Sequence, residues 1–362
     1  MSSTNLRILF VITSLRLGGA ERLVADLAKG LKNRGHHVDI FVFDATETPI
    51  TIELKRYGIS IFGKRKGYRQ MRNPLVYFPL RRLLKQNKYD IIHTHNTTPQ
   101  FIAALVASNG AKLITTEHNT HNRRRKIPIL SNLDRLMYSR YRKVVCVSEQ
   151  AKTNLLAYLK LEDVDSKFPV VYNGIDLQKF KSSDLPASPR HNPLRVIMVS
   201  GFRKQKDQAT LIKAFALLSD AYHLSLVGDG IERNACEQLV KELAIGHRIE
   251  FHGFKADVAP LLAESDIVVL STHYEGMPLS IIEGMAAGRP VIASDVDGLR
   301  EVVHGAGILF QEGDSAELAA KIVELANDNT LYAVVARKCA LRAEKFDIVS
   351  TIDSYEKIYH AV

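Results

Sequence analysis

The feature that most constrains the fold is a repeated alternation of short apolar runs with segments of helical periodicity. Strands separated by helices predict a parallel sheet that is covered on both faces. The chain begins with an apolar stretch of only about seven residues, too short to span a membrane and interpreted as a buried first strand. The first half contains a helix expected from about Ala20 to Arg34 and apolar runs at Ile8–Ile12, Val38–Phe43, Ile91–His93, Lys112–Thr115 and Val144–Val147.

The same alternation restarts in the second half, so the fold class is α/β with two Rossmann-like, doubly wound domains. A length of 362 residues agrees with two domains. We expect domains at 1–180 and 194–345, a Ser- and Pro-rich linker at 181–193, and a final helix at 346–362 that could pack on the N-terminal domain. The second set of runs is Arg195–Val199, Ser225–Val227, Ile249–Phe251, Ile267–Leu270, Val291–Ala293 and Ile308–Phe310.

The placement of motifs follows from this architecture. In open α/β sheets, ligands bind beyond the carboxyl ends of the strands, so residues directly after strands are the candidates for a site. Two such domains are expected to face each other across a deep cleft.

Basic charge is concentrated in the first half. Residues 1–180 hold 30 Lys and Arg against 14 Asp and Glu, which leaves 19 against 25 for residues 181–362. Such a field indicates an anionic partner, either nucleic acid, an anionic lipid surface or a phosphorylated substrate, while a merely soluble surface stays open. The basic clusters lie at Lys64–Arg72, Arg81–Lys85, Arg123–Lys126 and Arg140–Lys143.

The most specific motif is EGMPLSIIEGMAAGRPVIAS, from Glu275 to Ser294. Pro278 suits the first turn of a helix, so the backbone around Met277, Pro278 and Leu279 forms a helix N-terminus that attracts a phosphate. Pro278 itself has no N–H to donate. Glu275 and Glu283, eight residues apart, are acceptors suited to sugar hydroxyls.

This motif resembles that of the family 4 retaining glycosyltransferases of the GT-B fold, whose signature is two glutamates separated by seven residues. The resemblance covers nearly the whole chain. It implies that Glu283 holds the ribose of a nucleotide diphosphate sugar and that Glu275 and Gly276 lie at the donor sugar. A UDP-sugar is preferred over a GDP-sugar, and neither a metal nor a further cofactor is expected.

A second motif, VIMVSGFRKQKDQATLIKAF, resembles the second phosphate-binding element of the family. Lys206 matches the lysine that contacts the donor diphosphate. The family usually has an arginine five residues earlier, where this chain has Gly201, and Arg203 is the nearest substitute. A solvated loop charge is the alternative for Arg203.

Other matches are softer. Gly18 and Gly19 follow the first strand and let backbone approach a ligand, on the acceptor side in the resemblance. His118 matches the family's active-site histidine beside the donor sugar, so the implied catalytic set is His118, Lys206 and Glu275. His93 and His95 could be structural or touch substrate. Two turns that the resemblance places beside the nucleotide contain Gly228 and Phe254.

Two patterns argue against metal and disulfide sites. The three cysteines, Cys146, Cys236 and Cys339, are far apart and lack CxxC spacing, which indicates a reducing cytoplasm. Asp295 and Asp297 mimic a metal-binding pair, but they lie in a turn and are interpreted as turn residues.

We therefore expect a retaining glycosyltransferase that moves a hexose or N-acetylhexosamine onto a hydroxyl acceptor, a lipid-linked glycan of a cell-surface polysaccharide. The basic half would bind the inner face of an anionic membrane, with the enzyme cytoplasmic and peripheral. Two alternatives are a nucleotide-sugar 2-epimerase, which needs no acceptor, and a non-enzymatic nucleic-acid binder. The nucleic-acid binder leaves Glu275 and Glu283 unexplained.

Overall fold

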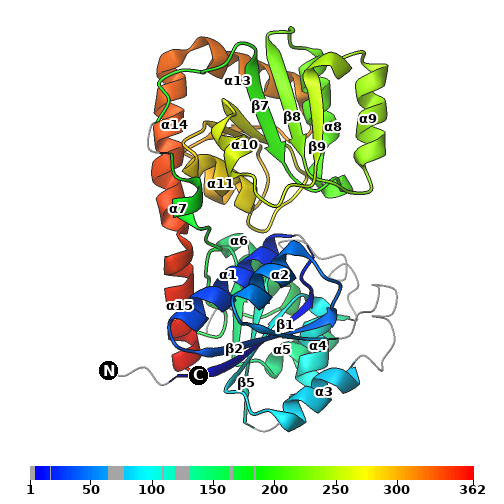
Figure 1. Ribbon diagram of the computed structural model, residues 1–362, viewed down its shortest axis with the longest axis vertical. Coiled ribbons are helices and arrows are strands. Elements are labelled where there is room, and N and C mark those ends of the chain that lie inside the picture. The colour runs from blue at the N-terminus through cyan, green and yellow to red at the C-terminus, as the bar shows by residue number, and fades with distance from the viewer. Residues whose placement is uncertain are drawn as a thin grey trace. The chain divides into compact units, whose positions relative to one another are not determined.

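The computed structural model describes residues 5–16, 18–63, 77–107, 110–118, 130–162, 166–182 and 185–362. It divides into two compact units (Figure 1). Unit 1 comprises Met1–Gly174 and Ile348–Val362, and unit 2 comprises Ile175–Asp347.

The chain leaves unit 1 earlier than the composition indicates, because the expected linker 181–193 belongs to unit 2. Its end is fixed there by the buried Asp266 carboxylate, which accepts hydrogen bonds from the Arg190 backbone N–H at 2.7 Å and from His191 Nδ1 at 3.1 Å. A segment rich in Ser and Pro can therefore pack against one domain instead of linking two domains.

Unit 1 contains a six-stranded parallel sheet with the order β3-β2-β1-β4-β5-β6. Five of its strands were predicted; β3 was missed because it has only three residues, none of them buried, and so shows no periodicity. The strands are β1 (Arg7–Ser14), β2 (His37–Asp44), β3 (Ser60–Phe62), β4 (Ile91–His95), β5 (Lys112–Glu117) and β6 (Lys143–Cys146).

The helices of unit 1 include the last helix of the chain. That helix, α15, packs against α1, and its side chains Ile352, Tyr355 and Tyr359 join Phe10 and Leu27 in the core of unit 1. Figure 1 shows α15 beside α1, although the two lie at opposite ends of the chain. The helices are α1 (Gly19–Asn33), α2 (Pro49–Arg56), α3 (Tyr77–Gln86), α4 (Thr97–Val106), α5 (Leu130–Ser139), α6 (Glu149–Leu159) and α15 (Ile348–His360).

Unit 2 contains a second six-stranded parallel sheet, with the order β12-β11-β10-β7-β8-β9. Every residue of β10 and β11 is buried, as expected for central strands covered on both faces. All six strands were predicted. They are β7 (Leu194–Val199), β8 (Tyr222–Val227), β9 (Ile249–Gly253), β10 (Ile267–Leu270), β11 (Val291–Ser294) and β12 (Ile308–Phe310).

The helices of unit 2 pack in pairs on this sheet, α8 with α13 and α11 with α14. Among the residues that the structure describes, no helix of either unit is long and apolar enough to cross a bilayer. The helices are α7 (Leu177–Phe180), α8 (Gln208–Ala216), α9 (Arg233–Glu242), α10 (Ala259–Ala263), α11 (Leu279–Ala286), α12 (Leu299–Val303), α13 (Ser315–Asn327) and α14 (Asn329–Ala343), with 3-10 turns η4 (Lys204–Lys206), η5 (Gly246–Arg248) and η6 (Glu344–Phe346).

The two sheets share one topology, which confirms the predicted pair of doubly wound α/β domains. In each, the strand order reverses beside the first strand, between β1 and β4 in unit 1 and between β7 and β10 in unit 2. Ligands of such sheets bind at this switch point, beyond the carboxyl ends of the strands. The loops after β1, β4, β7 and β10 are therefore where a site is expected.

Candidate functional site

Two loops at the switch point of unit 2 bring Lys206 and Glu275 together. Lys206 ends the turn η4 after β7, Glu275 lies in the loop after β10, and the Lys206 ammonium donates a hydrogen bond to Glu275 Oε1. The two side chains keep only 19% and 7% of their exposure, so the pair is largely removed from water. A cation and a carboxylate thus lie where the topology places a ligand.

A network centred on Gln205 holds the two loops in register. Its side-chain amide donates to the Tyr274 carbonyl at 2.6 Å, and its carbonyl accepts from the His273 backbone N–H at 2.9 Å. The same carbonyl accepts from Thr272 Oγ1 at 2.8 Å, and Thr272 Oγ1 also lies 3.1 Å from Glu275 Oε1. Sequence reasoning missed Gln205 and Thr272, although both lie in loops that follow strands, which was a usable signal.

The helix α11 begins immediately after this loop. Pro278 is its N-cap residue, one position earlier than the predicted first turn, because its ψ of 94° is extended and the helix starts at Leu279. The N-cap residue Pro278 makes no side-chain capping hydrogen bond, so the first amides of α11 and the helix dipole favour an anion. Gly276 and Met277 complete the connection to Glu275.

Glu283 lies one turn into α11. It is half-buried and shares a helix face with Leu279 and Ser280, which are also half-buried, whereas Ile281 and Ile282 point into the core. The buried Glu275 in the loop before α11 and the half-buried Glu283 within α11 therefore lie on either side of the N-terminus of one helix.

Gly298 supports the Glu275 loop from below and was not predicted. Its φ of +82° belongs to the left-handed region, and a Cβ there would lie 2.5 Å from the Glu275 carbonyl oxygen and 2.8 Å from that of Gly276. Only glycine fits such a close approach. The preceding turn residues Asp295 and Asp297 both face Arg300, at 2.6 Å and 3.8 Å.

The loops after β7 and β8 also pack backbone against backbone. A Cβ on Gly228, whose φ is +140°, would lie 2.0 Å from the Ser200 carbonyl oxygen. The Phe202 N–H donates to the Asp229 carbonyl at 3.0 Å, which extends the pairing of the strands into the loops. Gly228 thus allows the loop after β8 to lie close to the loop after β7.

Arg203 is exposed at the start of η4, and its Nε lies 3.7 Å from the position that a Cβ on Gly201 would occupy. The guanidinium therefore folds back toward the place where the family arginine would begin. Phe254, after β9, exposes 43% of its surface at the same edge of the sheet.

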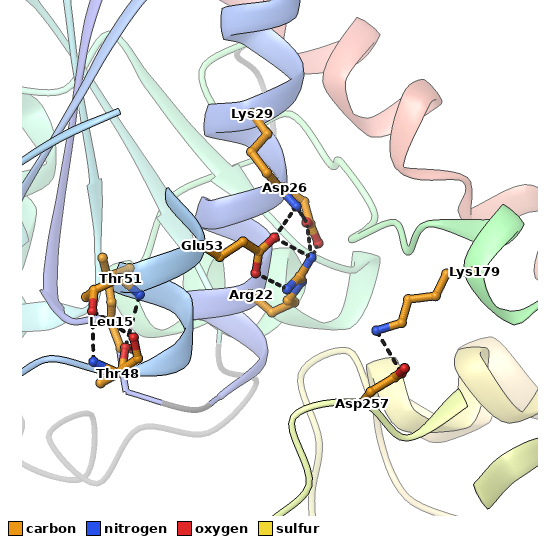
Figure 2. Close-up of polar contacts among 9 residues, drawn as sticks. All are labelled: Leu15, Arg22, Asp26, Lys29, Thr48, Thr51, Glu53, Lys179 and Asp257. Carbon is orange, nitrogen blue, oxygen red and sulfur yellow. Dashed lines mark hydrogen bonds and ion pairs between the residues drawn. The ribbon is translucent and has the colours of Figure 1, made fainter. Parts of the chain in front are cut away.

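In unit 1, the glycine loop after β1 is fixed on both sides. Thr48 Oγ1 donates to the Leu15 carbonyl at 2.7 Å (Figure 2), and Arg16 pairs with Asp44 at 3.1 Å. Gly18, extended at φ −177°, and Gly19 then lead into α1. A Cβ on Gly18 would lie 2.3 Å from a Glu21 carboxylate oxygen, so that side chain covers this glycine.

The first helix after this loop is joined to α2 by a charge network. Arg22 pairs with Asp26 at 2.7 Å and with Glu53 at 2.9 Å, and Lys29 contacts both carboxylates (Figure 2). These bonds fix α1, and with it the direction in which the glycine loop enters the helix.

The three candidate histidines of unit 1 form one cluster at the ends of β4 and β5. His95 Nδ1 lies 2.9 Å from His118 Nε2, whereas His93 bonds to Tyr359 at 2.7 Å and to Thr116 at 2.8 Å. Burial lowers the pKa of His118 to about 4 and the pKa values of His93 and His95 well below their usual value. All three rings are therefore neutral at pH 7.

The structure brings the predicted site residues into two groups, one in each unit. Lys206, Glu275 and the N-terminus of α11 form the group in unit 2, and His118 and the glycine loop lie at the matching edge of unit 1. The basic clusters at 64–72 and 123–126 fall outside the described residues; Arg81, Arg82 and Lys85 of α3 are described and exposed.

Comparison with known proteins agrees with this geometry. Residues 193–328 match the family model described as Glycosyl transferases group 1, and residues 17–179 match that described as Glycosyltransferase Family 4. The chain is 28% identical to N-acetyl-alpha-D-glucosaminyl L-malate synthase of Bacillus anthracis, over 96% of this chain and 94% of that protein.

Two further proteins are similar to this chain, one in sequence and one in fold. The chain is 25% identical to UDP-Gal:alpha-D-GlcNAc-diphosphoundecaprenol alpha-1,3-galactosyltransferase of Escherichia coli, over 77% of each protein. Its fold matches the crystal structure of HepE of Anabaena in complex with UDP-glucose, with a TM-score of 0.86 and 23% identity over 99% of this chain and 100% of that chain.

Proposed function

Because this chain belongs to the family 4 glycosyltransferases, enzymes that use nucleotide sugars, we propose that it transfers a hexose or N-acetylhexosamine from a UDP-sugar, with retention, to a hydroxyl of a lipid-linked glycan. The observation that carries this proposal is the contact of Lys206 with Glu275 beside the uncapped N-terminus of α11. It offers a cation and oriented amides for a diphosphate, next to carboxylates for hydroxyl groups.

A bound donor diphosphate would compete with Glu275 for the Lys206 ammonium. When a diphosphate binds at the N-terminus of α11, the ammonium can contact its oxygens and leave Glu275 to accept from the sugar hydroxyls. Glu283, on the accessible face of α11, accepts from the ribose hydroxyls. Each such charge-assisted hydrogen bond contributes about 1.5–3 kcal/mol.

The transfer step separates charge, and the residues of unit 2 stabilise it. The bond between the anomeric carbon and the phosphate oxygen breaks, and its electron pair stays on the diphosphate. Lys206, Arg203 and the amides of α11 stabilise that growing negative charge. The acceptor oxygen attacks the same face of the sugar, and its proton passes to the departing phosphate oxygen. The family resemblance gives His118 a contact with the donor sugar.

The preference for UDP and for a lipid-linked acceptor rests on relatives. HepE binds UDP-glucose, and the galactosyltransferase of Escherichia coli is named for a UDP-Gal donor and a diphosphoundecaprenol acceptor. The basic surface of unit 1 supports a membrane-borne acceptor. On α3, Arg81, Arg82 and Lys85 are exposed together with Phe78, a combination suited to an anionic lipid surface.

The donor site is tested by titrating UDP into Lys206→Ala and Glu283→Ala by calorimetry. We expect each variant to lose about 1.5–3 kcal/mol of binding free energy, or about tenfold to a hundredfold in affinity. Lys321→Ala, which removes one partner of an exposed pair with Glu324 on α13, is the matched control and should bind UDP normally.

Unchanged affinity in both site variants would refute the donor site. A product released from UDP-sugar by the wild-type enzyme without any acceptor would instead favour the epimerase alternative.

A further inference from the structure

We propose that His95 is a positioning residue that holds His118 in the tautomer with its proton on Nδ1, so that His118 presents an N–H donor to a substrate oxygen. This inference rests on the proposed role of His118 at the donor sugar. It adds a residue and a protonation state to that role.

The two histidines are placed by neighbouring parallel strands. His95 is the last residue of β4 and pairs in register with Thr116 of β5, and His118 follows β5 directly. His95 is completely buried, whereas His118 is half-buried and reaches the surface at the carboxyl edge of the sheet. The bond of 2.9 Å between their rings therefore joins the core of unit 1 to its ligand-binding edge.

Aromatic rings fix the orientation of His95. Its centroid lies 4.2 Å from that of His93 and 5.7 Å from that of Phe10. His93 is itself held by Tyr359 of α15 and by Thr116, so the stack cannot rotate freely. His95 Nδ1 consequently remains directed at His118.

The surroundings of His95 Nε2 determine which ring nitrogen of His95 carries the proton. His95 Nε2 is buried and has no hydrogen-bond partner among the residues that the structure describes. A neutral ring carries one N–H, and burying that N–H without an acceptor is less favourable than burying a lone pair. The proton of His95 therefore resides on Nδ1 and is donated to His118 Nε2.

The same bond determines what His118 can do. Because His118 Nε2 accepts from His95, the single proton of the neutral His118 ring lies on Nδ1. His118 then acts toward a ligand as a hydrogen-bond donor to a hydroxyl or phosphate oxygen. It does not offer a lone pair for removing the proton of the acceptor hydroxyl.

Burial supports neutrality on both sides of the bond. The pKa of His95 is lowered well below its usual value by burial and further by the neighbouring His93 and His118. The pKa of His118 is lowered by burial to about 4. Two neutral rings, each with its proton on Nδ1, are the state that the cluster favours at pH 7.

The first test measures the tautomer in the free enzyme, without turnover. Two-bond ¹H–¹⁵N correlations of protein labelled with ¹⁵N-histidine distinguish a protonated Nδ1 from a protonated Nε2 at neutral pH. We expect the resonances of His118, assigned with a His118→Gln variant, to report a proton on Nδ1. A proton on Nε2 of His118 would overturn the proposal.

The second test uses His95→Leu, which has no hydrogen bond to offer, and His95→Asn, whose amide can replace Nδ1–H. We expect His95→Leu to lower kcat about tenfold, with the KM for the nucleotide sugar changed by less than about threefold, and His95→Asn to restore most of kcat. His36→Leu, which removes a buried histidine of unit 1 whose ring bonds to the Leu6 N–H and to Glu356, is the control and should keep kcat within about threefold.

These outcomes distinguish a failure of the positioning role of His95 from a failure of the proposed transferase function. Equal losses in His95→Leu and His95→Asn, or an undiminished kcat in His95→Leu, would refute the positioning role while leaving the transferase function intact. If His95→Leu does not fold, the tautomer measured in the wild-type enzyme decides the proposal. If no nucleotide sugar is turned over, the proposed function fails, and the tautomer can still be read.

Discussion

His93, His95 and His118 lose their ordinary basicity because the fold buries them. Protonating any of the three would place a positive charge beside the other two rings in a site with little water. At the residue scale, the histidine cluster of unit 1 thus offers neutral donors and acceptors. The carboxyl edge of the sheet in unit 2 holds the ion pair of Lys206 and Glu275.

The free energy of unfolding should therefore depend on pH below about 6.5. Between the usual histidine pKa and the lowered folded values, the unfolded chain binds protons that the folded chain excludes, so stability rises with pH and is lost as pH falls. Each buried histidine contributes about 1.4 kcal/mol per pH unit in this window. Urea unfolding from pH 4.5 to 7 measures the slope.

His93→Gln should reduce that slope, whereas His304→Gln, which changes an exposed histidine, should leave it unchanged. Equal slopes in both variants and the wild type would show that the cluster already binds protons in the folded state.

Arg203 carries a second prediction at this scale. Its Nε lies next to Gly201, where the family arginine is missing, so Arg203→Ala should weaken UDP binding by about 1 kcal/mol or more. The exposed neighbour Lys204 on the same turn is the matched control. Calorimetry that finds Lys204→Ala and Arg203→Ala equally harmless would show that Lys206 binds the diphosphate without an arginine partner.

Sequence reasoning proposed site residues that belong to local motifs and did not identify contacts between distant parts of the chain. Lys206, Glu275 and Glu283 have a spacing that one sheet topology explains. The partners of the histidine cluster have no such spacing in the sequence. Tyr355 and Tyr359 follow His93 by more than 250 residues and contact it because α15 packs on unit 1. The linker at 181–193 was placed from composition, which does not reveal the bonds of Arg190 and His191 to Asp266.

At the scale of secondary-structure elements, close contacts between backbone segments hold the loops of the site in place. Eleven of the twelve strands were predicted because central parallel strands are continuous apolar runs, and only the short edge strand β3 escaped. The loops could not be predicted in the same way. Their geometry depends on approaches such as that of Gly298 to the Glu275 carbonyl, which leave no periodic signal.

Gly298→Ala should displace the Glu275 loop, because its Cβ would lie 2.5 Å from a backbone oxygen that cannot move independently of the loop. We expect weaker UDP binding and a loss of about 1–3 kcal/mol in stability. Gly313→Ala is the matched control: its φ of +78° carries the same strain, but no atom lies within 4 Å of the added Cβ.

Calorimetry and thermal unfolding of both variants separate backbone strain from contact with the site. If Gly313→Ala and Gly298→Ala lose the same stability and both bind UDP normally, the turn at Gly298 does not support the donor loop.

At the scale of the whole molecule, the excess of basic residues lies in residues 1–180, most of which belong to unit 1. Reversal of Arg81, Arg82 and Lys85 to Glu should release the enzyme from anionic vesicles, since each basic residue near such a surface contributes about 1 kcal/mol. UDP binding should persist, because the proposed donor-binding residues Lys206 and Glu283 lie in unit 2. Reversal of Lys241, Arg337 and Lys338, exposed residues of unit 2, is the matched control.

Vesicle co-sedimentation in low and high salt measures this effect, and salt should imitate the reversal on α3 because it screens surface attraction. Binding that survives both the reversal and high salt, or that falls equally in the control, would contradict a membrane role for this surface.

The return of α15 to unit 1 has a consequence for biosynthesis. Unit 2 is one continuous segment, Ile175–Asp347, but unit 1 needs the final residues of the chain to cover its sheet, since Ile352, Tyr355 and Tyr359 belong to its core. On the ribosome, unit 1 must wait, with an incomplete core, until residues 348–362 have been translated. The second half can finish folding first, which reverses the usual order from the N-terminus onward.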